Sequence, residues 1–313
     1  MRSKLTPEQI ELLFKLRLDG LTWNEISEQI PTHTPNSLRK TYYREARREE
    51  PVKTNNGPKV LLFDIETAPI LGYVWALFDQ TVGLEQIHTD WHVLSWSAKW
   101  LGAPETEVMY LDQRNAENIE DDSKILKVIW DLLDEADIVI GQNSKKFDVK
   151  KLNARFIAHG FPPPSSFRQI DTLQIAKNSF GFTSNKLQYM TEKLCTKYKK
   201  LDHAEFSGFK LWKECLAGNL KAWNEMEKYN KYDVLSLEEL YLLLAPWDRS
   251  INFNVYAEDY IHRCTCGSSE IVEAGHHYTN RGKYAKYRCE TCGKEHRDTK
   301  NLLTKEKRSN MKV

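Results

Sequence analysis

The nine residues KVLLFDIET, at positions 59–67, decide the fold of this chain. The largely apolar run 59–63 is typical of a strand that is buried on both faces. Asp64 and Glu66 follow it directly, and alternate residues of a strand point to the same side. The segment therefore predicts a buried strand with two neighbouring carboxylates at its end. Taken alone, such a pair is most simply explained as solvated surface charge.

Further strands and helices extend from this segment toward the C-terminus. The hydrophobic patterns predict strands over 92–100, 107–111 and 137–141, and helices over 122–135 and 147–159. Three strands, a helix, another strand and more helices predict an α/β layer architecture. We expect a mixed sheet flanked by helices.

Two more acidic positions lie in comparable places. Asp148 opens the helix that follows the strand 137–141, and ligands gather at strand ends in α/β sheets. It could equally be an acid favoured by the dipole at a helix start. Tyr229 and Asp233 are four residues apart and share one helix face, beside an apolar stripe. An acid so close to a core needs a partner, either a metal ion or an arginine.

Together these segments resemble the DEDD, or DnaQ-like, 3′→5′ exonuclease superfamily, which has a ribonuclease-H-like fold. FDIET matches its first motif, NSKKFD (143–148) its second and Tyr229-x-x-x-Asp233 its third. Lys228 stands where the histidine subclass has its histidine, so the resemblance is to the tyrosine subclass. QIDTLQIAK (169–177) resembles the stretch after the second motif, and the match covers roughly residues 59–247.

The resemblance implies hydrolysis by two Mg²⁺ or Mn²⁺ ions, with nucleoside 5′-monophosphates as products. Asp64 is expected to bridge both ions, and Glu66 and Asp233 to complete the first site. Asp148 is expected to hold the second ion through water, and Tyr229 to orient the attacking water. Hard divalent ions prefer such oxygen ligands.

Further contacts with nucleic acid are expected around these motifs. Thr67 and Asn143 belong to the matched motifs, although a turn hydroxyl and a loop amide explain them as well. Tyr73, Trp75 and Phe78 lie in a long segment, 68–90, that departs from the family pattern. These aromatics could stack on bases, but we expect them to be buried against the sheet.

The N-terminal residues 1–50 predict three short helices. Thr22 and Glu25 form a capping box at the second helix, and a third helix opens at 34–35. The segment resembles Myb/SANT-like and related helix-turn-helix families, which implies DNA contacts from its last helix. A small bundle that contacts the other domains or a protein partner is the alternative. Residues 51–58 are predicted to be a linker. The expected contact residues are Arg39, Lys40, Tyr43 and Arg44.

Four cysteines near the C-terminus have metal-ligand spacing. Cys264-x-Cys266 and Cys289-x-x-Cys292 are each followed by glycine and resemble a zinc ribbon over 260–300, which implies one structural Zn²⁺. The first pair is C-x-C where C-x-x-C is usual, so the ligand set stays open. The spare candidate ligands are His262, His276, His277 and His296.

Composition fits these expectations. The 313 residues are 41% hydrophobic and 28% charged, as in globular proteins, with a net charge of +1. Residues 51–261 hold 24 basic against 30 acidic residues, whereas 262–313, including a basic tail at 301–313, hold 12 against six. An acidic centre beside a basic module suits a carboxylate site that relies on neighbours to bind a polyanion. No apolar run predicts a membrane span, and six cysteines do not make a disulfide scaffold.

The sequence therefore predicts a 3′→5′ exonuclease of the cytoplasm of a bacterial or phage-infected cell, acting on single-stranded 3′ ends. The helix-turn-helix resemblance favours DNA over RNA. No polymerase segment is present, so proofreading would require a polymerase or another replication partner in trans. An RNA-trimming exonuclease and a catalytically silent DNA-binding regulator are the alternatives.

Overall fold

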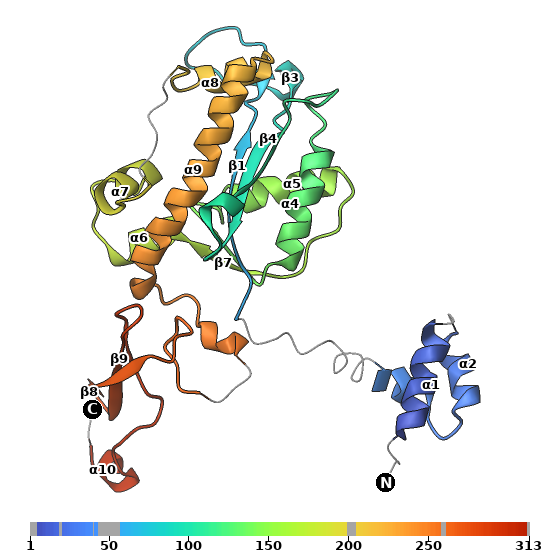
Figure 1. The fold of residues 1–313 in the computed structure, drawn as a ribbon, viewed down its shortest axis with the longest axis vertical. Helices are drawn as coiled ribbons and strands as arrows, with labels where there is room; N and C mark the ends of the chain where they lie inside the picture. Colours follow the sequence, from blue (N-terminus) through green and yellow to red (C-terminus); the bar gives the residue numbers. More distant parts are fainter. Residues whose placement is uncertain are drawn as a thin grey trace. The chain divides into compact units, whose positions relative to one another are not determined.

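The computed structural model describes residues 5–18, 21–39, 41–42, 57–198, 205–257 and 261–311. The chain divides into two compact units, Met1–Asn56 and Gly57–Val313 (Figure 1). Each unit has its own hydrophobic core. We describe them separately.

The first unit is helical, as predicted. It contains α1 (Pro7–Leu18), α2 (Trp23–Gln29) and further helical residues at 35–39 and 41–42. The expected capping box is present: Glu25 N donates to Thr22 Oγ1 over 3.4 Å, and Thr22 N donates to Glu25 Oε2 over 2.7 Å. Leu13, Ile26 and Leu38 are fully buried and hold the helices together.

The second unit is built on a five-stranded sheet in the order β5-β4-β1-β6-β7. β1 is antiparallel to β4 and parallel to β6, so the predicted mixed sheet is confirmed. β1 is longer than expected and includes Asp64 and Glu66, because pairing with β4 continues past the apolar run. The strands are β1 (Val60–Thr67), β4 (Val93–Trp100), β5 (Met109–Asp112), β6 (Ile138–Gly141) and β7 (Arg168–Asp171).

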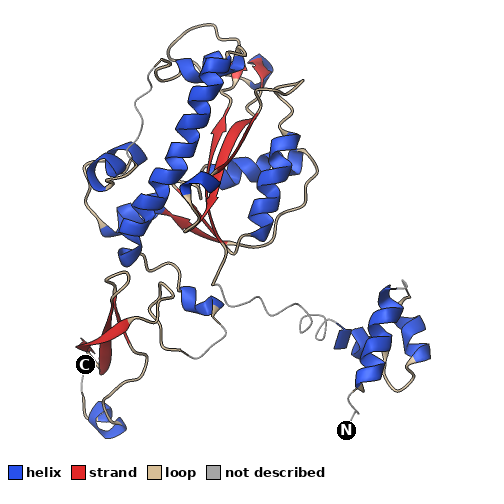
Figure 2. Cartoon of the chain, in the orientation of Figure 1, coloured by secondary structure: helices blue, strands red, loops and turns tan. Residues whose placement is uncertain are grey.

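Helices cover both faces of this sheet (Figure 2). Val60 and Leu62 of β1 pack against α6, α7 and α9. Leu61, Phe63 and Ile65 point the other way and pack against α4 and α5. The side chains at positions 64 and 66 therefore continue the face that α9 covers. The helices are α4 (Ser123–Glu135), α5 (Asp148–Ala158), α6 (Thr172–Ser179), α7 (Leu187–Leu194), α8 (Lys210–Leu216) and α9 (Leu220–Leu244), with η2 (Glu105–Glu107) and η3 (Ala245–Trp247) as short turns.

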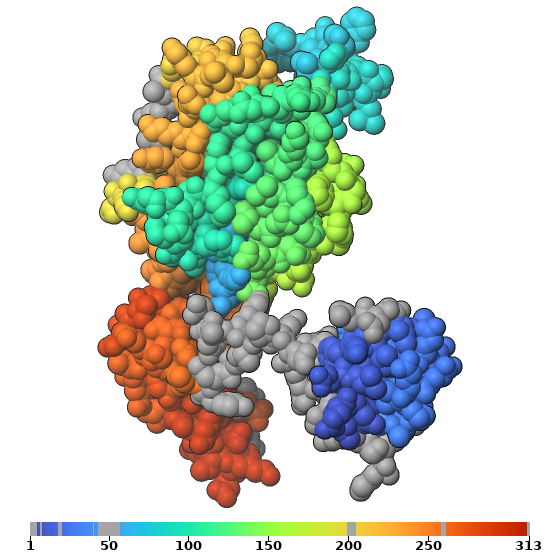
Figure 3. Space-filling model, turned by 45° about the vertical axis from the view of Figure 1, so that its right-hand side comes forward, coloured from blue at the N-terminus to red at the C-terminus, as the bar shows by residue number. Residues whose placement is uncertain are grey.

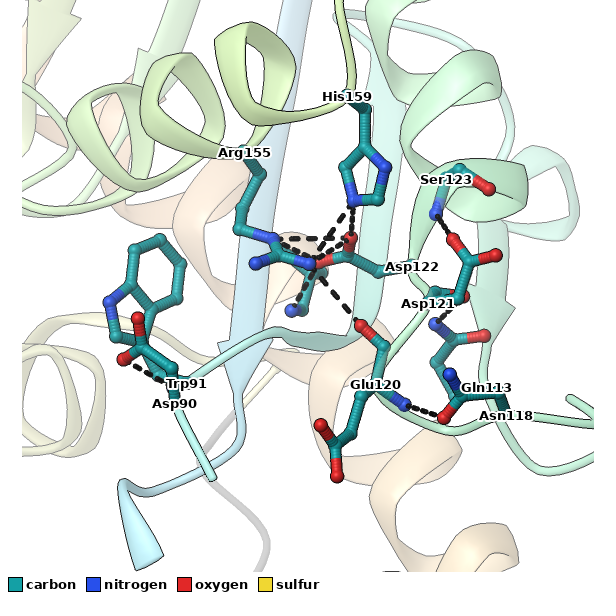
Figure 4. Close-up of polar contacts among 11 residues, drawn as sticks. Asp90, Trp91, Gln113, Asn118, Glu120, Asp121, Asp122, Ser123, Arg155 and His159 are labelled. Atoms are coloured by element: carbon teal, nitrogen blue, oxygen red, sulfur yellow. Dashed lines mark hydrogen bonds and ion pairs between the residues drawn. The ribbon is translucent and has the colours of Figure 1, made fainter. Parts of the chain in front are cut away.

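A buried carboxylate fastens the α4–α5 layer to the sheet (Figure 4). Asp122 is fully buried directly before α4, and its oxygens accept from Arg155 Nη2 and His159 Nε2, each over 2.7 Å. The same carboxylate accepts the backbone N–H of Val93 at the start of β4, over 2.8 Å. One charge thus satisfies donors from α5 and β4, as a buried ion requires.

The segment between β1 and β4 does not cover the sheet, so its predicted burial is wrong. β2 (Leu71–Gly72) and β3 (Ile87–Thr89) pair only with each other, with η1 (Leu84–Gln86) between them. Tyr73, Trp75 and Phe78 are 71%, 96% and 80% exposed. In Figure 3 this segment is the cyan projection from the second unit. Its aromatic content predicted a core position, but none of these three side chains belongs to a hydrophobic core of the described residues.

The C-terminal part forms a three-stranded antiparallel sheet in the order β10-β9-β8. Its elements are η4 (Phe253–Tyr256), β8 (Ile271–Thr279), β9 (Gly282–Cys289), β10 (Glu295–Arg297) and α10 (Lys305–Ser309). Across the described ranges, none of the helices combines the length and the hydropathy that a bilayer span requires.

Candidate active site

Strand β1 presents two carboxylates on one side. Asp64 lies opposite Ser97 of β4 and Glu66 opposite Ser95, so both acids project from the face covered by α9. The regular register of β1 and β4 ends between Glu66 and Thr67. The two acids therefore lie on the last regular part of the strand.

Helix α9 brings a third carboxylate to the same place. Asp233 is 6% exposed, and one oxygen each from Asp64, Glu66 and Asp233 lies within 4.8 Å of the other two. Three negative charges this close repel one another unless a cation or a proton lies between them. Mg²⁺ binds oxygens at about 2.0–2.1 Å in an octahedron, so neighbouring ligand oxygens lie about 3–4 Å apart. The carboxylate cluster fits a hard divalent cation.

Asp148 lies beside this cluster but outside it. The residue begins α5 and is 4% exposed, and its Oδ1 accepts the backbone N–H of Ile65 over 3.3 Å. Burial raises the pKa of Asp148, while the backbone hydrogen bonds oppose the shift and the charge of Asp171 adds to it. The hydrogen bond to Ile65 places this fourth acid against the backbone between Asp64 and Glu66.

Tyr229 stands one helical turn before Asp233 on α9. Its ring meets Trp212 of α8 edge-on, with 6.2 Å between ring centroids. Burial, the charges of Asp233, Glu66 and Asp64, and a hydrogen bond to Asp233 all raise the pKa of this phenol. The hydroxyl therefore stays protonated and acts as a hydrogen-bond donor.

Sequence reasoning missed Asn230, a buried residue of α9 that hydrogen-bonds to a carboxylate of the cluster. Asn230 is fully buried on α9, and its Nδ2 donates to Asp64 Oδ2 over 2.7 Å. Its Oδ1 accepts from Ser95 Oγ over 3.4 Å. Its signal was available, because Asn230 lies three residues before Asp233 and shares its helix face.

Asn143 follows β6 and has a left-handed backbone, with φ of 63°. Its N–H donates to Asp171 Oδ1 over 2.9 Å, and Asp171 also caps α6 through Leu173 N. The sequence analysis did not predict strand β7, and it did not identify Asp171, at the end of this strand, as a site residue. Thr67 ends β1. The structure thus places Thr67 next to Glu66 at the end of β1, and Asn143 in the loop after β6, hydrogen-bonded to Asp171.

The expected contact residues of the N-terminal unit are only partly described. Arg39 is exposed at the end of the helical stretch 35–39. Lys40, Tyr43 and Arg44 lie outside the described residues.

The four C-terminal cysteines converge on one point. Cys264 Sγ lies 3.7 Å from Cys292 Sγ, and Cys266 Sγ lies 3.7 Å from Cys289 Sγ. Tetrahedral zinc with bonds of about 2.3 Å places its sulfur ligands about 3.8 Å apart. The glycines after the two pairs have φ of 94° and 75°, a backbone that other residues rarely adopt. The C-x-C pair therefore reaches the same tetrahedral arrangement as the C-x-x-C pair, and the cysteine cluster includes no histidine among the described residues.

Comparison with known proteins agrees with this architecture. Residues 98–245 match the family model of the RNase_H superfamily, a stretch that includes Asp148, Tyr229 and Asp233 and begins after Asp64 and Glu66. The mixed sheet and its helices therefore have the predicted ribonuclease-H-like fold, and the match supports a nuclease.

A solved structure of the family B DNA polymerase from the hyperthermophilic archaeon Pyrobaculum calidifontis is similar at 17% identity, with a TM-score of 0.43. The similarity covers 60% of this chain and 25% of the polymerase, so it spans about a quarter of that protein. No curated protein matches the chain.

Proposed function

We propose that this chain is a metal-dependent 3′→5′ exonuclease that removes nucleotides from single-stranded 3′ ends of DNA. The carboxylate cluster supports this proposal most directly, because Asp64, Glu66 and Asp233 come from two separate elements and still meet within 4.8 Å. Acids at these positions repel one another and would be costly to bring together without a bound cation.

The four carboxylates are the proposed ligands of Mg²⁺ or Mn²⁺. Asp64, Glu66 and Asp233 would hold one ion, and Asp64 and Asp148 would hold a second. Two bound divalent cations supply positive charge that offsets the phosphodiester and its leaving oxygen. Asn230 holds one oxygen of Asp64 in place, so this carboxylate enters the reaction already oriented.

Tyr229 has a distinct role in this proposal. Its phenol remains protonated at neutral pH, so it orients the attacking water by a hydrogen bond and does not act as the base. The tyrosine four residues before Asp233 also supports the tyrosine subclass and, with it, removal of nucleotides from the 3′ end.

The preference for DNA rests on the helix-turn-helix resemblance of the N-terminal unit. An RNA exonuclease is the second candidate, since the described site shows nothing that would distinguish a 2′-hydroxyl. The complete set of acids and the tyrosine argue against a catalytically silent DNA-binding protein. One structural Zn²⁺ on Cys264, Cys266, Cys289 and Cys292 completes the proposed cofactors.

The decisive experiment digests single-stranded DNA, duplex DNA and RNA side by side, each labelled at either end, with the full chain. We expect a 3′ label to leave at once as a mononucleotide and a 5′ label to give a ladder. EDTA should stop hydrolysis, and Mg²⁺ or Mn²⁺, but not zinc alone, should restore it.

Variants connect the activity to the carboxylate cluster. Asp64→Asn and Asp233→Asn should abolish hydrolysis while circular dichroism stays unchanged. Asp131→Asn, which alters an exposed carboxylate on α4, is the matched control and should keep full activity. Substantial hydrolysis by folded Asp64→Asn would refute the proposal.

A further inference from the structure

A cleft of about 760 Å³ lies between the ribonuclease-H-like part, from β1 to the segment after α9 (residues 59–250), and the cysteine module (residues 261–300). This volume lies within the range of about 300–1,000 Å³ that is usual for ligand sites. Its walls come from the loop after β6, from helix α6, from the segment after α9 and from the turn after Cys292. The lining residues are Lys145, Asp171, Gln174, Ile175, Asn178, Ser179, residues 246–250, Lys294 and Glu295.

Hydrogen bonds connect the elements that surround the cleft, and the first of them joins two lining residues. Lys294 Nζ, in the turn after Cys292, donates to the carbonyl oxygen of Asp248. Arg168 Nη2, on β7, donates to Ser250 O over 2.9 Å. Phe253 N donates to Thr265 O, between the two metal-binding cysteines of the first pair, over 2.9 Å. The cleft is therefore built between connected elements of one unit.

Three cations and an aromatic ring line this space. Lys145 and Lys294 are half-buried and Arg249 is exposed. Trp247 is 54% exposed and meets Phe180 edge-on, with 5.2 Å between ring centroids. The Phe180 contact fixes the indole while part of it still faces solvent. Cations beside an exposed aromatic ring are the combination that binds single-stranded nucleic acid.

Three acids also line the cleft, so the formal charges of the lining residues cancel. Each of these acids accepts hydrogen bonds or forms ion pairs within the chain. Asp171 accepts the N–H groups of Asn143 and Leu173, over 2.9 and 3.0 Å. Asp248 accepts the N–H and the hydroxyl of Ser250, over 2.8 and 3.0 Å.

The third acid, Glu295, pairs with Arg288 over 2.6 Å and with Lys286 over 3.3 Å. Arg288 and Lys286 offset the charge of Glu295. The three cations of the cleft therefore face two uncompensated carboxylates, those of Asp171 and Asp248, and a net positive charge remains to attract an anion.

One end of the cleft lies at the loop between β6 and α5, the loop that leads to Asp148 of the candidate active site. Lys145 lies between Asn143 and Asp148 in sequence, on the loop that leads into α5. Asp171, in the wall, accepts the N–H of Asn143. A strand whose 3′ end reaches the carboxylate cluster could therefore continue past this loop toward the cysteine module.

We propose that this cleft binds the sugar-phosphate backbone of the substrate strand upstream of its 3′ end, with Trp247 stacked on a base. The proposal rests on the proposed exonuclease function. It assigns the cysteine module a direct part in substrate binding, through Lys294 in its second metal-binding turn.

Kinetics on two substrates of different length test the proposal. A 12-nucleotide oligothymidylate reaches the cleft, whereas the p-nitrophenyl ester of thymidine 5′-monophosphate does not. Arg249→Ala and Trp247→Ala should each raise KM for the 12-mer about fivefold or more, with kcat unchanged. Arg249→Ala should also lower the slope of log KM against log salt by about 0.7, the value for one lost phosphate contact on a single strand.

Controls separate the cleft from general damage. Both variants should hydrolyse the nitrophenyl ester like the wild type, and Trp247→Phe should recover most of the affinity for the 12-mer. Lys127→Ala, at an exposed lysine on α4, should change neither substrate. Wild-type KM and salt slope for the 12-mer in both Arg249→Ala and Trp247→Ala would overturn the proposal.

Photocrosslinking tests whether DNA binds in the cleft, independently of catalysis. Oligonucleotides with 5-iododeoxyuridine at single positions upstream of the 3′ end, in buffer without Mg²⁺, should crosslink to the peptide that contains Trp247. This result would stand even if the wild type hydrolysed no substrate, which would refute the exonuclease function alone. Crosslinks that avoid this peptide at every position would refute the cleft.

Discussion

Asn230 Nδ2 donates a hydrogen bond to Asp64 Oδ2 over 2.7 Å and thereby connects α9 to β1 at the carboxylate cluster. Asn230 is fully buried, and Ser95 of β4 donates to its other end. A buried amide with both ends engaged fixes the orientation of the carboxylate that it contacts. Asp64 is thus held from α9, the same helix that supplies Asp233.

Asn230→Ala should lower kcat/KM about 10- to 100-fold, the usual cost of losing a group that orients a metal ligand. The Mg²⁺ concentration for half-maximal activity should rise, because Asp64 loses its fixed orientation. Steady-state kinetics over a Mg²⁺ titration measure both effects. Lys228→Ala, at an exposed neighbour on α9, is the control. Unchanged Mg²⁺ dependence in a folded Asn230→Ala would contradict a positioning role.

Tyr229→Phe should lower kcat about 100-fold, the typical cost of removing one catalytic hydrogen-bond donor. Burial and the surrounding carboxylates raise the pKa of Tyr229 above its ordinary value, so we expect its phenol to stay protonated in the neutral pH range. The pH profiles of wild type and variant should therefore have the same shape, with the variant displaced downward. Loss of a basic limb in the variant would show instead that Tyr229 titrates during catalysis.

Zinc analysis tests the cysteine cluster. The purified chain should contain one zinc per molecule, and Cys292→Ser should lose it, because three thiolates no longer close the tetrahedron. His276→Ala, at an exposed histidine of β8, should keep the full zinc content. Equal zinc content in wild type and Cys292→Ser would contradict the four-cysteine site.

Much of the fold could be predicted because its signals are local. The apolar run before Asp64, the amphipathic helix 122–135 and the alternation of strands and helices gave the mixed sheet with covered faces. β7 was missed because RQID (168–171) is short and three of its four residues are polar. It is a strand because parallel pairing with β6 supplies its hydrogen bonds, which is a tertiary effect.

The site shows the same division between local and long-range information. The shared side of Asp64 and Glu66 follows from strand alternation, and the shared face of Tyr229 and Asp233 from helix periodicity. The position of Asp148 against Ile65 N depends on how α5 meets β1, so no local pattern gives it. Trp75 was wrongly predicted to be buried. Aromatic side chains become buried only where another element packs against them, and the local sequence does not show this.

A buried ion pair joins β4 to α9 and should contribute strongly to stability. Lys99 is 1% exposed, and its Nζ lies 2.7 Å from Glu238 Oε2. The other oxygen of Glu238 also accepts the N–H of Gly102, over 2.9 Å. Glu238→Ala would leave a buried ammonium group without its counter-charge and should lower the free energy of unfolding by about 3–5 kcal/mol.

Urea denaturation followed by far-ultraviolet circular dichroism measures this loss. The double variant Lys99→Met/Glu238→Leu should recover most of it, because neither charge is then buried. Glu135→Ala, which removes an exposed partner of Lys59, should cost less than about 1 kcal/mol. A double variant no more stable than Glu238→Ala would show that the loss comes from packing and not from the unpaired charge.

His92, 2% exposed at the entry to β4, should make stability depend on pH. Burial lowers its pKa, while the backbone of Asp90, as an acceptor for the protonated ring, and the charge of Asp122 oppose the shift. The folded chain therefore resists a proton that the unfolded chain accepts below about pH 6.5. The contribution of neutral His92 is complete above that pH and is lost as the pH falls toward the folded value. His92→Phe removes this titration. As the pH is lowered from 7.5 to 5.5, the free energy of unfolding of His92→Phe should therefore rise relative to that of the wild type. His277→Gln, at an exposed histidine, is the control and should follow the wild type. Parallel stability curves for wild type and His92→Phe over that range would show that His92 takes up its proton equally in both states.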